Sequence, residues 1–187
     1  MINCIKILKS STILIFLGIV FFSCENDISV VNSLKFNESV PIESSYNVES
    51  LITDSGRIRI SIKSPQVDNY LGDNQQVEMP KGIDIIFYDT TGHITSSLKA
   101  NYAINNITRR TIIVKYNVVA TNTDGEKLYT EELLWDQDNR KIYTNKPVKV
   151  VSVDKIIFGE GMTADETMNN WQIMHPHGEI DAGDLGK

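Results

Sequence analysis

The residues with the clearest spacing for chemistry lie near the end of the chain, where G-E-G-M-T-A (159–164) fits the pattern G-x-G-x-x-A. That pattern binds a dinucleotide when a strand precedes it, a helix follows it and an acidic residue about 20 positions further on reaches a ribose. A strand over 155–158 can precede it here, but the residues after Met162 are too few to complete a βαβ unit. We therefore interpret Gly159 and Gly161 as strand residues that serve a bulge or a close approach of another backbone.

Two further segments contain residue types that bind metals. His175 and His177 stand beside two carboxylates in the C-terminal segment, but a zinc site needs three or four ligands that rigid elements hold in place. The run N-T-D-G-E (122–126) is shorter than a calcium-binding loop, and Asp-Gly between two strands is typical of a hairpin turn. These observations predict neither a metal nor another cofactor.

The carboxylates Glu131, Glu132 and Asp136 share one expected strand, L-Y-T-E-E-L-L-W-D. Neighbours on a strand point to opposite faces, whereas a pair of acids that hydrolyses glycosides must face one cleft from two sides. The chain also contains no G-x-S-x-G motif for a serine nucleophile. The sequence therefore predicts that the protein is not an enzyme.

The N-terminal segment is typical of a secretory signal over residues 1–23. Lys6 and Lys9 precede an apolar run over 13–22, which is about half the length that a membrane-spanning helix needs. The sequence F-F-S-C that ends at Cys24 resembles a lipobox, with Phe in place of the usual Leu three positions before the cysteine. We expect cleavage before Cys24 and a lipid on its thiol.

Cleavage would leave Cys24 as the single cysteine, which excludes a disulfide and a cysteine metal site. The formal charge of the whole chain is −6, and the lost segment contains two lysines and no acid. A chain this acidic is a poor partner for nucleic acid or for anionic lipid headgroups. We expect a tether over 24–51, one domain over 52–174 and a flexible tail over 175–187.

Apolar and polar residues alternate from Gly56 onward, beginning with Ile58, Ile60 and Ile62. The period of two is that of half-buried strands, and turn signals such as Thr91-Gly92 and Asp124-Gly125 separate the runs. No segment between Gly56 and Phe158 has the pattern of an amphipathic helix. The pattern predicts an all-β sandwich, roll or barrel.

A repeat of 30 residues supports a stacked arrangement of strands. The shift aligns Leu98 with Leu128 and Arg110 with Arg140, and it also aligns Ala103 with Leu133, Ile112 with Ile142, and Val118 with Val148. Units with such a period bury their faces against their neighbours. Chance similarity between two β-hairpins is the alternative.

Four motifs occur in a familiar order, namely LKANYA (98–103), DGEKLYTEELLWD (124–136), KIYTNKPVKV (141–150) and GEGMTAD (159–165). Behind a single membrane anchor, this order resembles the LptC family of lipopolysaccharide-export proteins and, more broadly, the OstA-like β-jellyroll. The resemblance covers about 57–173. It implies an all-β fold, a twisted OstA-like jellyroll of stacked antiparallel strands that is open at its ends.

The resemblance also implies a function. A periplasmic protein anchored to a membrane, most simply the inner one, would take lipopolysaccharide from an inner-membrane ABC transporter and pass it to a periplasmic β-jellyroll bridge protein. Gly161 matches the family position where modules join edge to edge, so Gly159 and Gly161 are the expected partner edge. This chain departs from the family in its lipidated cysteine, since familiar members keep an uncleaved helix, and in its acidic charge.

The acidic charge is compatible with an anionic glycolipid if the protein holds the acyl chains and leaves the phosphates outside. The strand phases then give the candidate lining of an apolar groove, with Trp135 at a mouth of the groove. The candidates are Ile60, Ile85, Phe87, Leu98, Tyr102, Val114, Tyr116 and Trp135.

Core packing explains the same apolar residues equally well. The alternative function is therefore a surface or periplasmic β-sandwich lipoprotein that binds glycan or protein. A continuous groove open at both ends would favour transport, and a filled interior would favour the sandwich.

Overall fold

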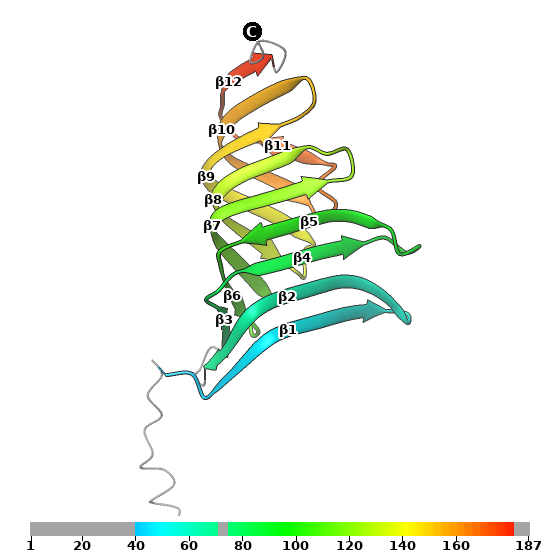
Figure 1. Ribbon diagram of the computed structural model, residues 1–187. Helices are drawn as coiled ribbons and strands as arrows, with labels where there is room; N and C mark the ends of the chain where they lie inside the picture. The colour runs from blue at the N-terminus through cyan, green and yellow to red at the C-terminus, as the bar shows by residue number, and fades with distance from the viewer. Residues whose placement is uncertain (1–39, 71–74, 182–187) are drawn as a thin grey trace, which may run out of the picture. The chain divides into compact units, whose positions relative to one another are not determined.

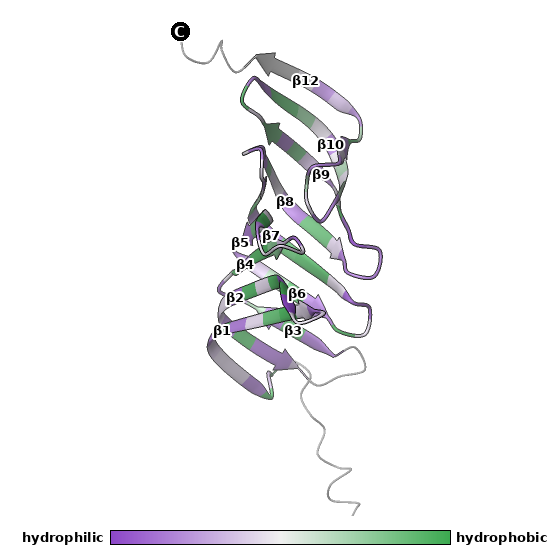
Figure 2. Ribbon diagram, turned by 90° about the vertical axis from the view of Figure 1, so that its right-hand side faces the viewer, coloured by the Kyte–Doolittle hydropathy of each residue, from purple (hydrophilic) through white to green (hydrophobic). Residues whose placement is uncertain are grey.

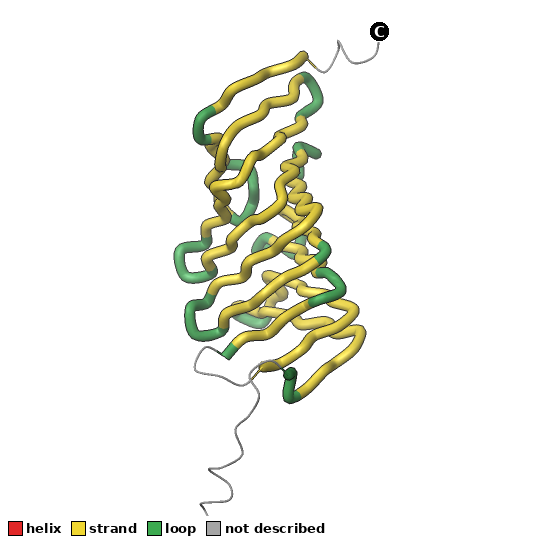
Figure 3. Tube along the Cα trace, turned by 90° about the vertical axis from the view of Figure 1, so that its left-hand side faces the viewer, coloured by secondary structure: helices red, strands yellow, loops and turns green. Residues whose placement is uncertain are grey.

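Alternating side chains produce strands throughout the part of the chain that the computed structural model describes, residues 40–70 and 75–181. Ile83, Ile85 and Phe87 are buried, for example, while Asp84 and Ile86 between them are only partly buried. Figure 3 shows strands and turns and no helix among these residues. Figure 2 shows that most hydrophobic stretches lie on the strands. The all-β prediction is confirmed.

In the described part of the chain, twelve strands form one antiparallel sheet, and Figure 1 shows them stacked from β1 to β12. Their bounds are β1 Glu43–Asp54, β2 Arg57–Tyr70, β3 Gln76–Met79, β4 Ile83–Tyr88, β5 Ile94–Ala100, β6 Tyr102–Asn106, β7 Thr111–Asn122, β8 Lys127–Asp136, β9 Lys141–Val151, β10 Lys155–Asp165, β11 Trp171–Ile173 and β12 Pro176–Asp181. The sheet thus extends beyond the expected domain on both sides. β1 begins within the expected tether, and β12 occupies the first part of the expected flexible tail because it pairs with β10.

The long strands change partners halfway along, which divides the sheet into two half-sheets. β2 pairs with β4 over 60–63 and with β3 over 68–70, and β7 pairs with β6 over 111–115 and with β5 over 119–122. Half-sheet A contains β4, β5, β12 and the parts of the long strands that pair with them. Half-sheet B contains β3, β6, β11 and the remaining parts. This exchange between layers is the arrangement of a jellyroll.

The two half-sheets meet along a crease, where the strands carry bulges and left-handed residues. The register shifts in β7 at Tyr116 and Asn117, with φ of 65° and 53°, and in β10 at Gly161, with φ of 88°. At the crease some backbone carbonyls lose their hydrogen bonds to the neighbouring strand, and buried hydroxyl groups donate to them instead. Ser64 Oγ donates to Gly82 O at 2.8 Å, and Thr130 Oγ1 donates to Pro147 O at 3.0 Å. A buried carbonyl without a donor would otherwise cost about 1–3 kcal/mol.

The 30-residue repeat coincides with the strand register. Leu98, Ala120, Leu128 and Val150 are successive partners across β5, β7, β8 and β9. Arg110 and Arg140 both adopt a left-handed conformation in the turns that follow β6 and β8. Each repeat therefore adds one layer to both half-sheets.

Candidate functional site

The interior between the half-sheets is apolar and filled. Half-sheet A contributes Ile85 and Leu98, and half-sheet B contributes Leu133 and Ile142, all at most 1% exposed. The Phe87 and Trp135 rings pack edge to face across the interior, with their centroids 5.1 Å apart. Replacing a residue such as Leu133 by Ala in a core like this costs about 2–5 kcal/mol. Because these side chains fill the space between the half-sheets, no continuous open groove runs between them in the described part of the chain.

The apolar lining continues past this core to both ends of the roll. At the β1 end, Ile52 and Ile58 are 41% and 42% exposed, and Ile60 and Ile62 are partly buried against the core. At the other end Trp171 and Ile173 are also partly buried against it. The interior is thus an apolar path with a packed middle and partly uncovered ends.

The structure brings six of the eight predicted groove residues together on the inner faces, namely Ile60, Ile85, Phe87, Leu98, Val114 and Trp135. Trp135 lies in the middle of the interior, 1% exposed, and not at a mouth. The predicted phase is wrong for Tyr102 and Tyr116. Tyr102 pairs with Lys115, in the phase opposite to the buried Val114, and Tyr116 is 56% exposed at the bulge of β7. The bulge turns Tyr116 outward, although Val114 and Val118 on either side of it are both buried. Tyr102 begins β6 after the chain leaves β5 at Ala100, so the alternation of β5 does not carry over to it.

The prediction that Gly159 and Gly161 form a free edge is also wrong, because β10 has neighbours on both sides. β9 pairs along one side, and β11 and β12 share the other. The interpretation as a bulge with a close backbone is confirmed. Met174 N donates to Gly161 O at 2.9 Å, and a Cβ on Gly159 would lie 2.1 Å from Ile173 Cγ2.

The turn between β10 and β11, residues 166–170, begins and ends in half-sheet B and reaches half-sheet A through hydrogen bonds, and we call it the strap. Glu166 anchors its first part, since one carboxylate oxygen accepts from Trp135 Nε1 at 3.0 Å and the other from Arg140 Nε at 2.9 Å. Two side chains of half-sheet A donate hydrogen bonds to the backbone of the strap. Ser96 Oγ donates to Glu166 O, and Asn122 Nδ2 donates to Met168 O. Met168 is 5% exposed and belongs to the core.

Asp165 shapes the beginning of the strap. Its carboxylate accepts from Thr167 Oγ1 and Asn170 Nδ2, both at 2.6 Å. Burial raises the pKa of Asp165, but these hydrogen bonds from Thr167 and Asn170 outweigh it, so the pKa lies below its ordinary value. The ionised form is therefore the one that fits the turn.

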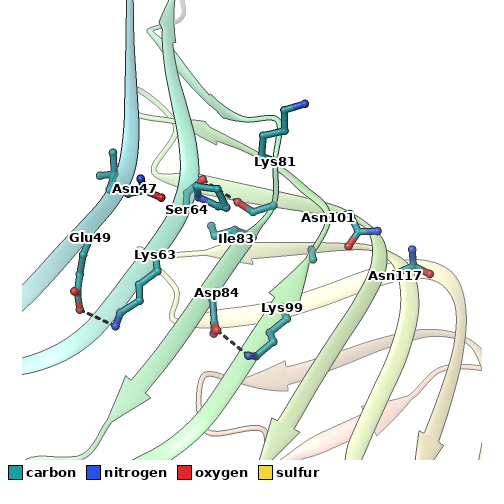
Figure 4. A pocket seen from close by; sticks show the side chains of 14 residues that line it. Asn47, Glu49, Lys63, Ser64, Lys81, Ile83, Asp84, Lys99, Asn101 and Asn117 are labelled. Atoms are coloured by element: carbon teal, nitrogen blue, oxygen red, sulfur yellow. Dashed lines mark hydrogen bonds and ion pairs between the residues drawn. The ribbon is translucent and has the colours of Figure 1, made fainter.

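A second feature lies on the outer side of the crease, where β2 leaves β4. It is a depression of about 550 Å³, shown in Figure 4. Two ion pairs line it, Lys63–Glu49 at 3.3 Å and Lys99–Asp84 at 2.8 Å, and Lys81 stands at its rim. Asp84 Oδ1 is buried without a hydrogen-bond partner among the described residues. We call this feature the crease depression.

Sequence reasoning missed both the strap and the crease depression. In the run D-E-T-M-N-N-W (165–171), the Asp followed two residues later by Thr is typical of a turn. The contacts of this turn with Ser96 and Asn122 could not be predicted, because they join residues more than 40 positions apart in the chain. The crease depression arises where β2 changes partner, which strand periodicity does not reveal.

Two further features concern the described residues, namely metal ligands and membrane-spanning helices. No group of three or more His, Cys, Asp or Glu side chains could hold a metal ion within these segments. Across 40–70 and 75–181 there is also no helix with the length and hydropathy to span a membrane. Cys24 and the expected signal lie outside the described residues.

A family model described as "Lipopolysaccharide-assembly, LptC-related" matches residues 11–175, which is most of the chain. No protein among the curated ones compared matches the chain.

Proposed function

Because the chain belongs to the LptC-related family of lipopolysaccharide-assembly proteins, which gives it a role in lipopolysaccharide transport in the cell envelope, we propose that it carries the acyl chains of lipopolysaccharide between its half-sheets. The observation that carries the proposal is the apolar path from Ile52 and Ile60 at one end to Trp171 and Ile173 at the other. Each buried methylene of an acyl chain contributes about 0.8 kcal/mol. The phosphates stay outside the roll, in water.

The packed middle of the interior means that the half-sheets must separate to admit acyl chains. Many small contacts hold them together, and a bound chain would replace these contacts by similar ones. The crease is the natural hinge, because its bulges and left-handed residues already interrupt the ladder. The proposal assigns no catalytic step and no cofactor to the protein.

Sheet edges provide the means of passing lipopolysaccharide on. β1 pairs only with β2 within the described residues, so one side of its backbone is available to a strand of another jellyroll. We propose that an inner-membrane ABC transporter delivers lipopolysaccharide and that a periplasmic bridge protein receives it, each through an end strand of this sheet. A lipid on Cys24 would anchor the protein to the inner membrane.

The crease depression favours a second candidate, binding of a glycan by a lipoprotein with a filled core. Its size suits a mono- or disaccharide, and Lys81, the two ion pairs and the unpartnered Asp84 oxygen offer donors and acceptors to hydroxyl groups.

Crosslinking from two neighbouring residues tests these candidates. Ile62 faces the interior, whereas Lys63 lines the crease depression. A photo-crosslinking residue at position 62 should capture lipopolysaccharide in cells, and the same residue at position 63 should not. Capture at position 63 alone, retained with deacylated oligosaccharide, would favour the glycan candidate and overturn the lipid one.

A further inference from the structure

The strap closes the side of the roll that lies opposite the crease. Ser96 and Asn122 of half-sheet A bind its backbone, while Glu166 is fixed to Trp135 and Arg140 of half-sheet B. We call the edges of the two half-sheets away from the crease their margins. Beyond the strap, Trp171 Nε1 donates to Glu126 Oε2 at 3.0 Å, which adds one more hydrogen bond between the two margins. These bonds join the margins across the open side.

A carrier of this kind has a geometric requirement. If acyl chains travel inside the roll and a large polar headgroup stays in water, the connection between them must pass along a slot on the open side. The strap crosses that slot, and Met168 fills the interior beneath it. A headgroup cannot move past a closed strap while its chains remain inside.

We propose that the strap is a latch that releases half-sheet A each time a glycolipid passes, with Glu166 as its anchor and Met168 as its plug. The inference rests on the proposed function. In the open state Met168 leaves the core, and an acyl chain occupies the space that it vacates.

The contacts of the strap fit a removable element. It is held to half-sheet A by side-chain hydrogen bonds and not by a strand ladder, and Asn169 and Asn170 are exposed. Met168 has a left-handed φ of 57°, a conformation that is unfavourable for a residue with a side chain. Local opening is favoured in such weakly held segments.

A hollow beside the strap shows where a chain could first enter. A cavity of about 220 Å³ is lined by Ile60 and Phe87 from the interior and by Glu166 and Thr167 from the strap. Release of Glu166 would join this cavity to the space under Met168. The route leads directly to the packed middle of the apolar path.

The test compares Ser96→Ala with the unchanged protein. The substitution removes the hydroxyl that donates to Glu166 O, so one of the two bonds from half-sheet A to the strap backbone is lost while the Glu166 carboxylate stays fixed to half-sheet B. Loss of this hydrogen bond should shift the latch toward its open state about tenfold. If binding requires the open state, the apparent Kd for purified lipopolysaccharide falls by the same factor.

Met168→Ala provides a second variant, which removes the plug and should also lower the apparent Kd. Asn169→Ala, at an exposed position of the same turn, is the matched control and should leave it unchanged. Ile156→Val removes a methyl group from a buried residue that is not part of the core cluster, and it controls for general loss of stability.

Hydrogen exchange gives a readout that a purely structural role would not change. Bound lipopolysaccharide should increase exchange in 166–170 while the neighbouring strands stay protected. If lipopolysaccharide binds every variant equally and the strap stays protected, the latch is wrong and the carrier proposal stands. If no variant and not even the unchanged protein binds it, the proposed function fails, and the latch with it.

Discussion

Single residues on the outer face of half-sheet B show how burial alters chemistry. Tyr102 lies there, with its ring centroid 6.1 Å from that of Tyr116. Burial, followed by the nearby carboxylate of Glu78, raises the pKa of Tyr102 to about 12. The folded protein therefore favours the neutral phenol more than the unfolded chain does, whose tyrosines titrate near 10.

The sign of the pH dependence follows from this shift. The stabilisation from a neutral Tyr102 is complete below pH 10 and is lost as the pH rises through about 12. We expect the free energy of unfolding, measured by urea titration, to fall across this window. Tyr102→Phe should reduce the fall, whereas Tyr143→Phe, exposed on the same face, should retain it. An unchanged slope in Tyr102→Phe would contradict the assignment.

At the scale of the elements, the crease decides how the strands are used. β2, β7 and β10 each serve both half-sheets because a bulge or a bend turns the strand at the crease. Gly161 is the clearest case. Its φ is 88°, and a Cβ there would lie 3.0 Å from Thr144 O and 2.8 Å from Met174 Cε.

Gly161→Ala should therefore destabilise the fold by about 1–3 kcal/mol, since the left-handed backbone and the crowding both oppose a side chain. Gly92→Ala is a close control, because Gly92 has a φ of 90° but nothing within 4 Å of the added Cβ. Chemical denaturation of both variants separates the two causes. Equal losses would show that crowding at the crease contributes nothing.

On the scale of the whole molecule, the expected lipid anchor and the sheet act as separate parts. The described sheet begins at Glu43, well after Cys24, and none of its contacts among the described residues requires an anchor. We predict that Cys24→Ala leaves the jellyroll folded, while the protein is either released from the membrane or held there by an uncut signal. Mass spectrometry of the mature protein and circular dichroism of the variant check both parts. An unmodified Cys24 in the native protein would contradict the anchor.

The sequence by itself determined the class of fold and most of the core. A period of two puts Ile85, Leu98 and Val114 in the phase of the predicted lining whichever strands they pair with, and all three are buried. The order of four short motifs was enough for the resemblance to the LptC family, which the family match over 11–175 confirms.

Only the tertiary structure decided the faces of Tyr102 and Tyr116, the covering of Gly161 and the position of the strap. The bulge in β7 turns Tyr116 outward while Val114 and Val118 stay buried, and nothing in the alternation marks its position. β12 covers β10 through pairing at its far end, and Glu166 meets Trp135 across 31 positions of the chain. Such contacts depend on which strands become neighbours, and local periodicity is the same for every choice of neighbour.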